Sequence, residues 1–136
     1  MRRSLQSYRK VSLDNEIAVA SPHRIIQMMF EGALQRIAQS RYAIGNNDLA
    51  TKGLNIGKAI GIINGLNSSL NMDAGGEMIG NVSALYDFML RRLSEANINN
   101  DIQALDDVSE ILRTIKEGWD AIPVEQHHIV SHTEAV

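Results

Sequence analysis

A long interval without proline lies between Pro22 and Pro123, the two prolines of this 136-residue chain, and it restricts the fold strongly. The interval is rich in Ala, Leu, Ile, Gln and Arg and lacks the Val, Thr and Tyr alternation of strands, which favours helices. A chain of this length forms one domain, and because six of its residues are aromatic we expect an aliphatic core.

Start and stop signals divide the interval into four amphipathic helices. Ser21, Asp48 and Asp101 are the expected N-caps. Pro22 is the expected first residue of a helix, a position at which the missing backbone N–H of proline costs no hydrogen bond. Glycine and asparagine mark the ends, most clearly within residues 71–76. Apolar residues spaced by three or four positions then predict helices over residues 22–45, 49–70, 78–96 and 102–122.

A short repeat indicates how these helices are connected. Asn46-Asn47-Asp48 recurs as Asn99-Asn100-Asp101, in each case between two predicted helices. Short connections make consecutive helices antiparallel, so two helical hairpins are expected. The prediction is an all-α, antiparallel four-helix bundle over residues 21–122, with a mobile N-terminal arm at 1–20 and a disordered C-terminal tail at 123–136.

The net charge of the chain and its distribution bear on the kind of partner. The formal charge of −3 argues against nucleic acid as a partner. It is unevenly distributed: residues 1–60 hold nine basic and four acidic groups, whereas residues 61–136 hold four basic and twelve acidic groups. We interpret this asymmetry as attraction between two halves of one bundle; the alternative is a face that steers a partner.

The expected location is the cytoplasm. The chain has no cysteine, and the residues after Arg2 and Arg3 are too polar for a secretory signal. No apolar stretch approaches the length of a membrane span, so membrane insertion is not expected.

No group of residues has the spacing of a catalytic, cofactor or metal site. The segment 53–59 resembles a phosphate loop, but it has three residues between its glycines and Ala59 after its lysine. A metal site in a helical bundle needs histidines inside helices, whereas these stand near a helix start or in the tail, at His23, His127, His128 and His132. We therefore predict no catalytic residue, no metal and no cofactor.

The second predicted helix carries a glycine ladder, which we define as Gly53, Gly57, Gly61 and Gly65. Each glycine costs roughly 0.5–1 kcal/mol relative to alanine inside a helix, so a compensating role is expected. Tight packing inside the bundle is our first interpretation. A groove for a partner and a helix break at Asn64-Gly65 are the alternatives.

The order of motifs resembles the flagellin export chaperones, the FliS family, from about Leu5 to Trp119. The matching residues are Tyr8, Ala20-Ser21-Pro22, Ile25-Ile26, Met28-Met29-Phe30, Gly32-Ala33-Leu34, Lys58-Ala59, Ile62-Ile63, Leu66, Ser69-Leu70, Gly75-Gly76-Glu77-Met78, Asn81-Val82, Leu85-Tyr86-Asp87-Phe88-Met89, Ala96-Asn97 and Asp101. The full glycine ladder departs from the family pattern.

The resemblance implies a non-enzymatic cytoplasmic chaperone with a four-helix bundle. Such a protein binds the disordered C-terminal part of flagellin, prevents its premature polymerisation and presents it to an export gate protein of the flagellar type III apparatus. In the family an N-terminal arm covers a groove until the client displaces it, a role that would fall on Leu5 and Tyr8.

Methionine fills irregular cores and also lines adaptable binding surfaces, so we expect most of the methionines in the core and some on a surface for a mobile client. The predicted partner-binding residues are Leu5, Tyr8, Ile25, Met28, Met29, Gly57, Gly61, Tyr86 and Met89. One alternative is a regulatory adaptor for an anti-sigma factor or another flagellar export component, and another is a helical-bundle enzyme or metal carrier. A homodimer of the free protein remains open.

Overall fold

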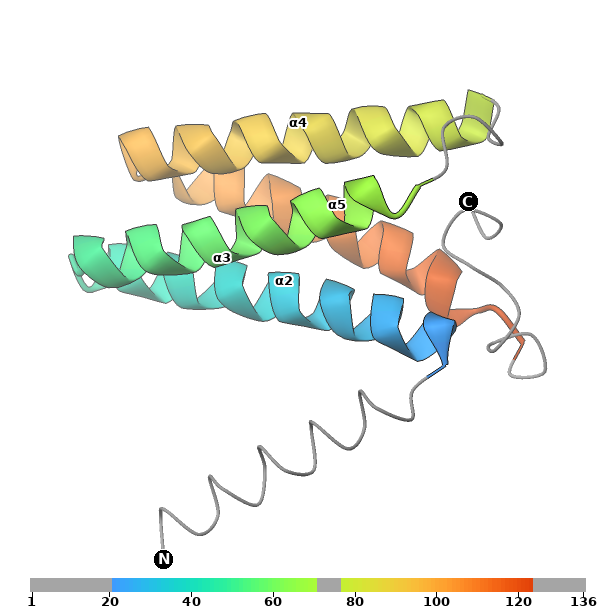
Figure 1. Cartoon of the computed structure of the whole chain (residues 1–136). Helices are drawn as coiled ribbons and strands as arrows, with labels where there is room; N and C mark the ends of the chain where they lie inside the picture. Colours follow the sequence, from blue (N-terminus) through green and yellow to red (C-terminus); the bar gives the residue numbers. More distant parts are fainter. Residues whose placement is uncertain (1–20, 71–76, 124–136) are drawn as a thin grey trace, which may run out of the picture.

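The computed structural model describes residues 21–70 and 77–123, and within these ranges every secondary-structure element is a helix. The elements are α2 (Pro22–Gly45), α3 (Leu49–Ser68), α4 (Glu77–Asn99) and α5 (Ile102–Asp120). Consecutive helices run in opposite directions (Figure 1). The prediction of an all-α, antiparallel four-helix bundle is confirmed; the predicted arm and the tail from residue 124 lie outside the described residues.

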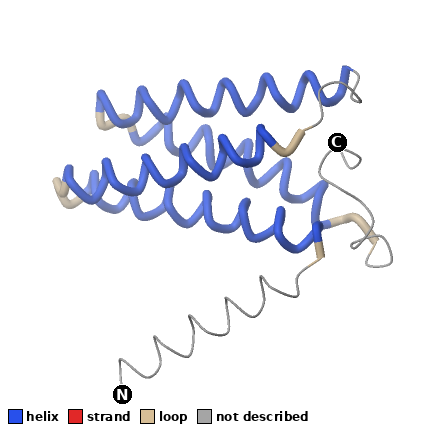
Figure 2. The backbone as a smooth tube through the Cα atoms, viewed as in Figure 1, coloured by secondary structure: helices blue, strands red, loops and turns tan. Residues whose placement is uncertain are grey.

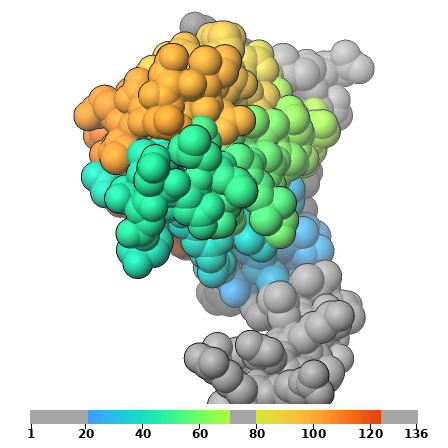
Figure 3. Space-filling view, turned by 90° about the vertical axis from the view of Figure 1, so that its left-hand side faces the viewer, coloured from blue at the N-terminus to red at the C-terminus, as the bar shows by residue number. Residues whose placement is uncertain are grey.

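The helices are arranged in a ring, in which each packs against its neighbours in the chain. Helix α2 packs against α3 and α5, and α4 packs against the same two helices. The start of α2 and the end of α5 lie side by side at one end of the bundle, and both short turns lie at the other (Figure 2). Figure 3 looks at the end with the turns, where the first hairpin lies below the second.

The three expected N-caps all form. The Ser21 hydroxyl accepts a hydrogen bond from the Arg24 amide, and the Asp48 and Asp101 carboxylates accept from the amides three residues further on, each at 3.2 Å. The bonds from Thr51 lower the pKa of Asp48, because they stabilise the ionised carboxylate. These local bonds explain why the helix starts could be predicted from short stretches of sequence.

The repeated Asn-Asn-Asp segments form the same turn twice. The second asparagine of each, Asn47 and Asn100, has a left-handed backbone with φ of 57° and 52°. The following aspartate amide donates to the carbonyl five residues earlier, Ala43 for Asp48 and Ala96 for Asp101. This is the hydrogen-bond pattern of a helix end closed by a left-handed residue, which asparagine tolerates.

Helices α3 and α5 end earlier than predicted, at Ser68 and Asp120. At the end of α3 the Ser69 hydroxyl donates to the Leu66 carbonyl at 2.7 Å, which closes the last turn. Ile122 precedes Pro123, and a residue before proline is disfavoured in the helical conformation. The apolar pattern therefore extends beyond the helices, although Leu70 is still buried.

The core is mainly aliphatic, as expected, but it also contains Phe30, Tyr86 and Trp119. Its other large, fully buried side chains are Ile37, Ile56, Ile63, Leu66, Met89, Leu93, Leu105, Val108 and Leu112. Burial raises the pKa of the Tyr86 hydroxyl, because the phenolate would lose its hydration. Tyr86 is therefore a neutral core residue.

Direct ion pairs account for little of the attraction expected between the two halves. Among the described residues, the ion pair that joins the hairpins is Arg41–Asp106, at 2.9 Å. The others lie within one hairpin, including that between Arg92 of α4 and Asp107 of α5. Residues 21–70 hold five basic and two acidic groups, and residues 77–123 hold four and nine. Each hairpin thus keeps a charge of its own sign.

Candidate functional site

An open groove runs along the outer seam between α2 and α3, and we call it the α2–α3 groove. It consists of two hollows that share Gln35. The turn-side hollow, of about 600 Å³, is lined by Gln35, Arg36, Ala38, Gln39, Tyr42, Ala43, Asn46, Asp48, Thr51, Leu54 and Asn55. The methionine hollow, of about 430 Å³, is lined by Arg24, Ile25, Met28, Met29, Glu31, Gly32, Gln35 and Ile62.

Large apolar side chains of this groove face solvent. Tyr42 is 76% exposed, Leu54 is 60% exposed and Ile25 is 40% exposed. Exposed apolar groups gathered in a concave surface are typical of sites that bind a protein segment. The groove therefore offers a binding surface that packing within the bundle leaves open.

Helix periodicity explains why these side chains are exposed. In α2 the buried positions include Ile26, Phe30, Ala33 and Ile37, and Tyr42 is out of phase with that stripe. In α3, Leu54 lies two positions before buried Ile56 and so points to a different face. An apolar residue out of phase with the core stripe is the sequence signal that could have identified Tyr42 and Leu54, which our prediction missed.

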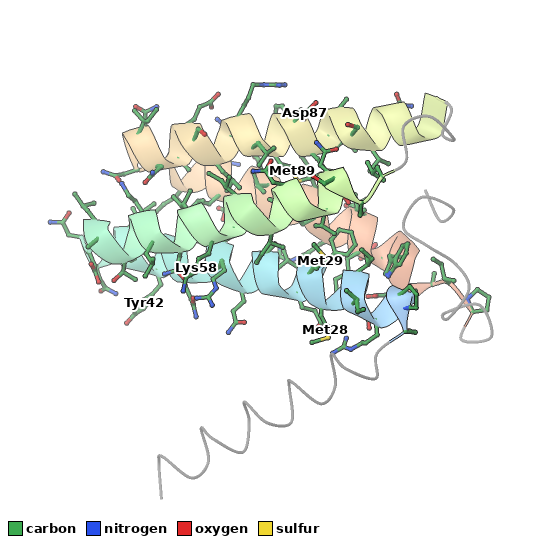
Figure 4. The ribbon with its side chains drawn as sticks, viewed as in Figure 1. Met28, Met29, Tyr42, Lys58, Asp87 and Met89 are labelled. Carbon is green, nitrogen blue, oxygen red and sulfur yellow. The ribbon has the colours of Figure 1, made fainter. Side chains whose placement is uncertain are left out.

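Three of the predicted binding residues lie together in the methionine hollow. Ile25, Met28 and Met29 all come from the first turns of α2 and line this hollow with Ile62 of α3. Figure 4 shows the two methionines at this end of the seam, with Met28 on the outer side of α2. The structure therefore brings these residues into one surface, and their contact with a partner stays a prediction.

Tyr86 and Met89 lie elsewhere. Both are 0% exposed and belong to the core between the helices, so a partner cannot touch them in this structure. They mark the buried stripe of α4, and any influence on binding would act through the packing of the bundle. Leu5 and Tyr8 lie outside the described residues.

The four residues of the glycine ladder have different surroundings. A Cβ atom on Gly57 or Gly61 would meet nothing within 4 Å. The prediction of tight packing inside the bundle is therefore wrong at these two positions. A Cβ on Gly53 would lie 3.8 Å from Asn97 Oδ1, and one on Gly65 would lie 3.0 Å from Met29 Cε. The alternative of a helix break is also wrong, since α3 continues to Ser68.

Gly61→Ala is therefore expected to raise the free energy of unfolding by about 0.5–1 kcal/mol, because alanine favours helix and the new methyl group meets open space. Urea unfolding followed by circular dichroism measures the change. Gly65→Ala is the control: its methyl group must displace the end of Met29, so its gain should be smaller. A loss of stability in Gly61→Ala would contradict the open environment.

The buried histidine has a structural role. His23 and Trp119 stack with ring centroids 5.0 Å apart and an interplanar angle of 7°. The Trp119 indole N–H donates to the His23 carbonyl at 2.9 Å, and His23 Nε2 lies 2.7 Å from the Trp119 carbonyl oxygen. These contacts join the start of α2 to the end of α5.

The described residues contain no group of three or more His, Cys, Asp or Glu side chains that could hold a metal ion. Nor does any helix in the described ranges have the length and apolar character needed to cross a membrane. The α2–α3 groove is lined mainly by apolar and amide side chains, which suits binding more than catalysis.

Comparison with known proteins agrees with a binding role. The family model described as "Flagellar protein FliS" matches residues 4–126. The flagellar secretion chaperone FliS of Vibrio cholerae is 47% identical over 131 residues, which cover 96% of this chain and 96% of the relative. FliSB of Pseudomonas aeruginosa is 45% identical over 88% of this chain and 95% of its own length, and FliS of Salmonella typhimurium is 41% identical over 87% and 88%.

These names describe a secretion chaperone and not an enzyme, which confirms the prediction of a non-catalytic protein. The family match covers α2 to α5 in full, including the residues that line the groove. The chain belongs to the FliS family of flagellar secretion chaperones.

Proposed function

We propose that the protein holds the disordered C-terminal segment of flagellin in the α2–α3 groove, in the bacterial cytoplasm. By covering apolar parts of that segment it prevents premature polymerisation, and it presents the client to an export gate protein. The observation that carries this proposal is the gathering of exposed apolar side chains along one seam, with Tyr42 and Leu54 more than half exposed. The names of the relatives support an export client as the occupant.

A long groove suits a client without stable structure. A disordered segment loses conformational entropy when it binds, so it needs extended apolar contact to reach useful affinity. Amphipathic segments that become helical on binding commonly bury their apolar face in grooves between helices. The two hollows provide such contact at two places along α2.

Calorimetric titration with the C-terminal segment of flagellin from the same organism tests this function. We expect binding of about one client per chaperone with a negative heat-capacity change, because apolar surface is buried. Absence of heat at two temperatures would contradict the proposal and favour the regulatory adaptor, whose anti-sigma factor could then be titrated in the same way.

We further propose that the N-terminal arm covers the groove in the free protein through Leu5 and Tyr8. Tyr8→Ala should then lower the apparent dissociation constant for the client, by about twofold or more if the arm covers the groove at least half of the time. The same titration gives the constant, and unchanged thermal unfolding shows that the fold is intact. An equal or weaker affinity would exclude a purely covering role.

A further inference from the structure

Between the two hollows, the α3 side of the groove carries a lysine. Lys58 follows Leu54 by four residues and precedes Ile62 by four, so all three share one face of α3. Leu54 lines the turn-side hollow and Ile62 lines the methionine hollow. Figure 4 shows Lys58 between Tyr42 and the two methionines along the length of the bundle. Lys58 itself lines neither hollow, but it lies beside the groove, between the α3 residues that line the two hollows.

The charge of Lys58 has no counterpart in the bundle. Among the described residues it is exposed and makes no hydrogen bond or ion pair. The neighbouring arginines of α2 are engaged: Arg24 pairs with Glu31 at 3.1 Å, and Arg36 donates to Asn55 at 3.2 Å. Arg41 pairs with Asp106, and Lys52 donates to Asn97 and Asn100 of the other hairpin. Among the described residues, Lys58 is therefore the cation of this hairpin that has neither a hydrogen bond nor an ion pair.

Two polar side chains of the turn-side hollow, Arg36 and Asn55, already have partners within the bundle. The Asn55 amide donates to the Thr51 carbonyl and accepts from Arg36, which donates to Gln39 as well. An extended client would need partners for its own backbone groups, whereas a helix satisfies them internally. A helical client segment would therefore need to contact the groove only through its side chains.

We propose that Lys58 binds a carboxylate of an amphipathic helical segment of the export client. This inference rests on the proposed function and adds a chemical pattern to it: an acidic residue flanked by two apolar clusters, one for each hollow. Met28 and Tyr42 are 14 positions apart in α2, which corresponds to about 21 Å along the axis, or about four turns. The acidic residue belongs near the middle of this span.

Lys58→Glu tests the pairing, with Arg91→Glu as the matched control. Arg91 is also exposed and unpaired among the described residues, but it lies on α4, which contributes no residue to either hollow. Both variants have the same change in net charge. We expect Lys58→Glu to weaken binding of the flagellin C-terminal segment about tenfold, because attraction becomes repulsion, and Arg91→Glu to change it less than about twofold.

Two further measurements separate a local pair from a general charge effect. The difference between the wild-type protein and Lys58→Glu should shrink when salt is raised from about 0.05 M to about 0.5 M. Replacing acidic residues of the client one at a time by lysine should identify one change that restores binding to Lys58→Glu and weakens binding to the wild-type protein.

Equal effects of Lys58→Glu and Arg91→Glu would overturn the role of Lys58 while leaving client binding in place. The same conclusion would follow if no reversed client residue restored affinity. Failure of the wild-type protein to bind the segment would instead reject the proposed function, and the inference with it.

Discussion

Trp119→Ala will lower the free energy of unfolding by about 3–5 kcal/mol, a large part of the stability of a small domain. Trp119 is 3% exposed, stacks on His23 and donates its indole hydrogen to the His23 carbonyl. Alanine removes the ring, leaves a cavity and removes the hydrogen bond that ties the end of α5 to the start of α2. Denaturant unfolding followed by circular dichroism measures the loss without depending on tryptophan fluorescence.

Trp119→Phe provides the control, and it remains informative if the alanine variant does not fold. Phenylalanine keeps an aromatic ring against His23 but cannot donate the hydrogen bond, so a loss of about 1–2 kcal/mol is expected. A Trp119→Ala variant as stable as the wild-type protein would show that the contact between the two ends contributes little.

The second large effect concerns the client. Leu54→Asp is expected to weaken binding of the flagellin C-terminal segment by at least about thirtyfold, the size of an interface hot spot. Leu54 is 60% exposed and lines the turn-side hollow, so a carboxylate there would have to lose its hydration against apolar client groups. Calorimetric titration gives the dissociation constant of the variant.

Leu49→Asp is the matched control. Leu49 also belongs to α3 and is 50% exposed, but it lines neither hollow. Both changes leave the core intact, so both variants should unfold at nearly the temperature of the wild-type protein. Equal losses of affinity in the two variants would place the client outside the α2–α3 groove.

The features that could be predicted correctly depend on short stretches of sequence. Ser21, Asp48 and Asp101 cap helices through bonds to amides three residues away. The two Asn-Asn-Asp turns each need one left-handed residue and one bond to a carbonyl five positions back. Because such interactions lie within a single turn, residue type and spacing were sufficient to predict them.

The site was only partly predictable, because apolar periodicity does not show which apolar residues lie in the core. Met89 and Met29 both follow helical stripes, yet Met89 is fully buried and Met29 lines a hollow. The glycine ladder looks uniform in the sequence, but helix neighbours approach Gly65 and leave Gly57 and Gly61 open. These differences depend on the positions of neighbouring helices.

Short-range hydrogen bonds and apolar spacing specify the helices, their caps, the two equivalent turns and the antiparallel order, so these features follow from the sequence alone. Which residues meet across the bundle depends on the tertiary structure. His23 and Trp119 are 96 positions apart and interact because α2 and α5 close the ring. The α2–α3 groove and the unpaired charge of Lys58 arise in the same way, from the packing of one helix against another and the faces that this packing leaves exposed.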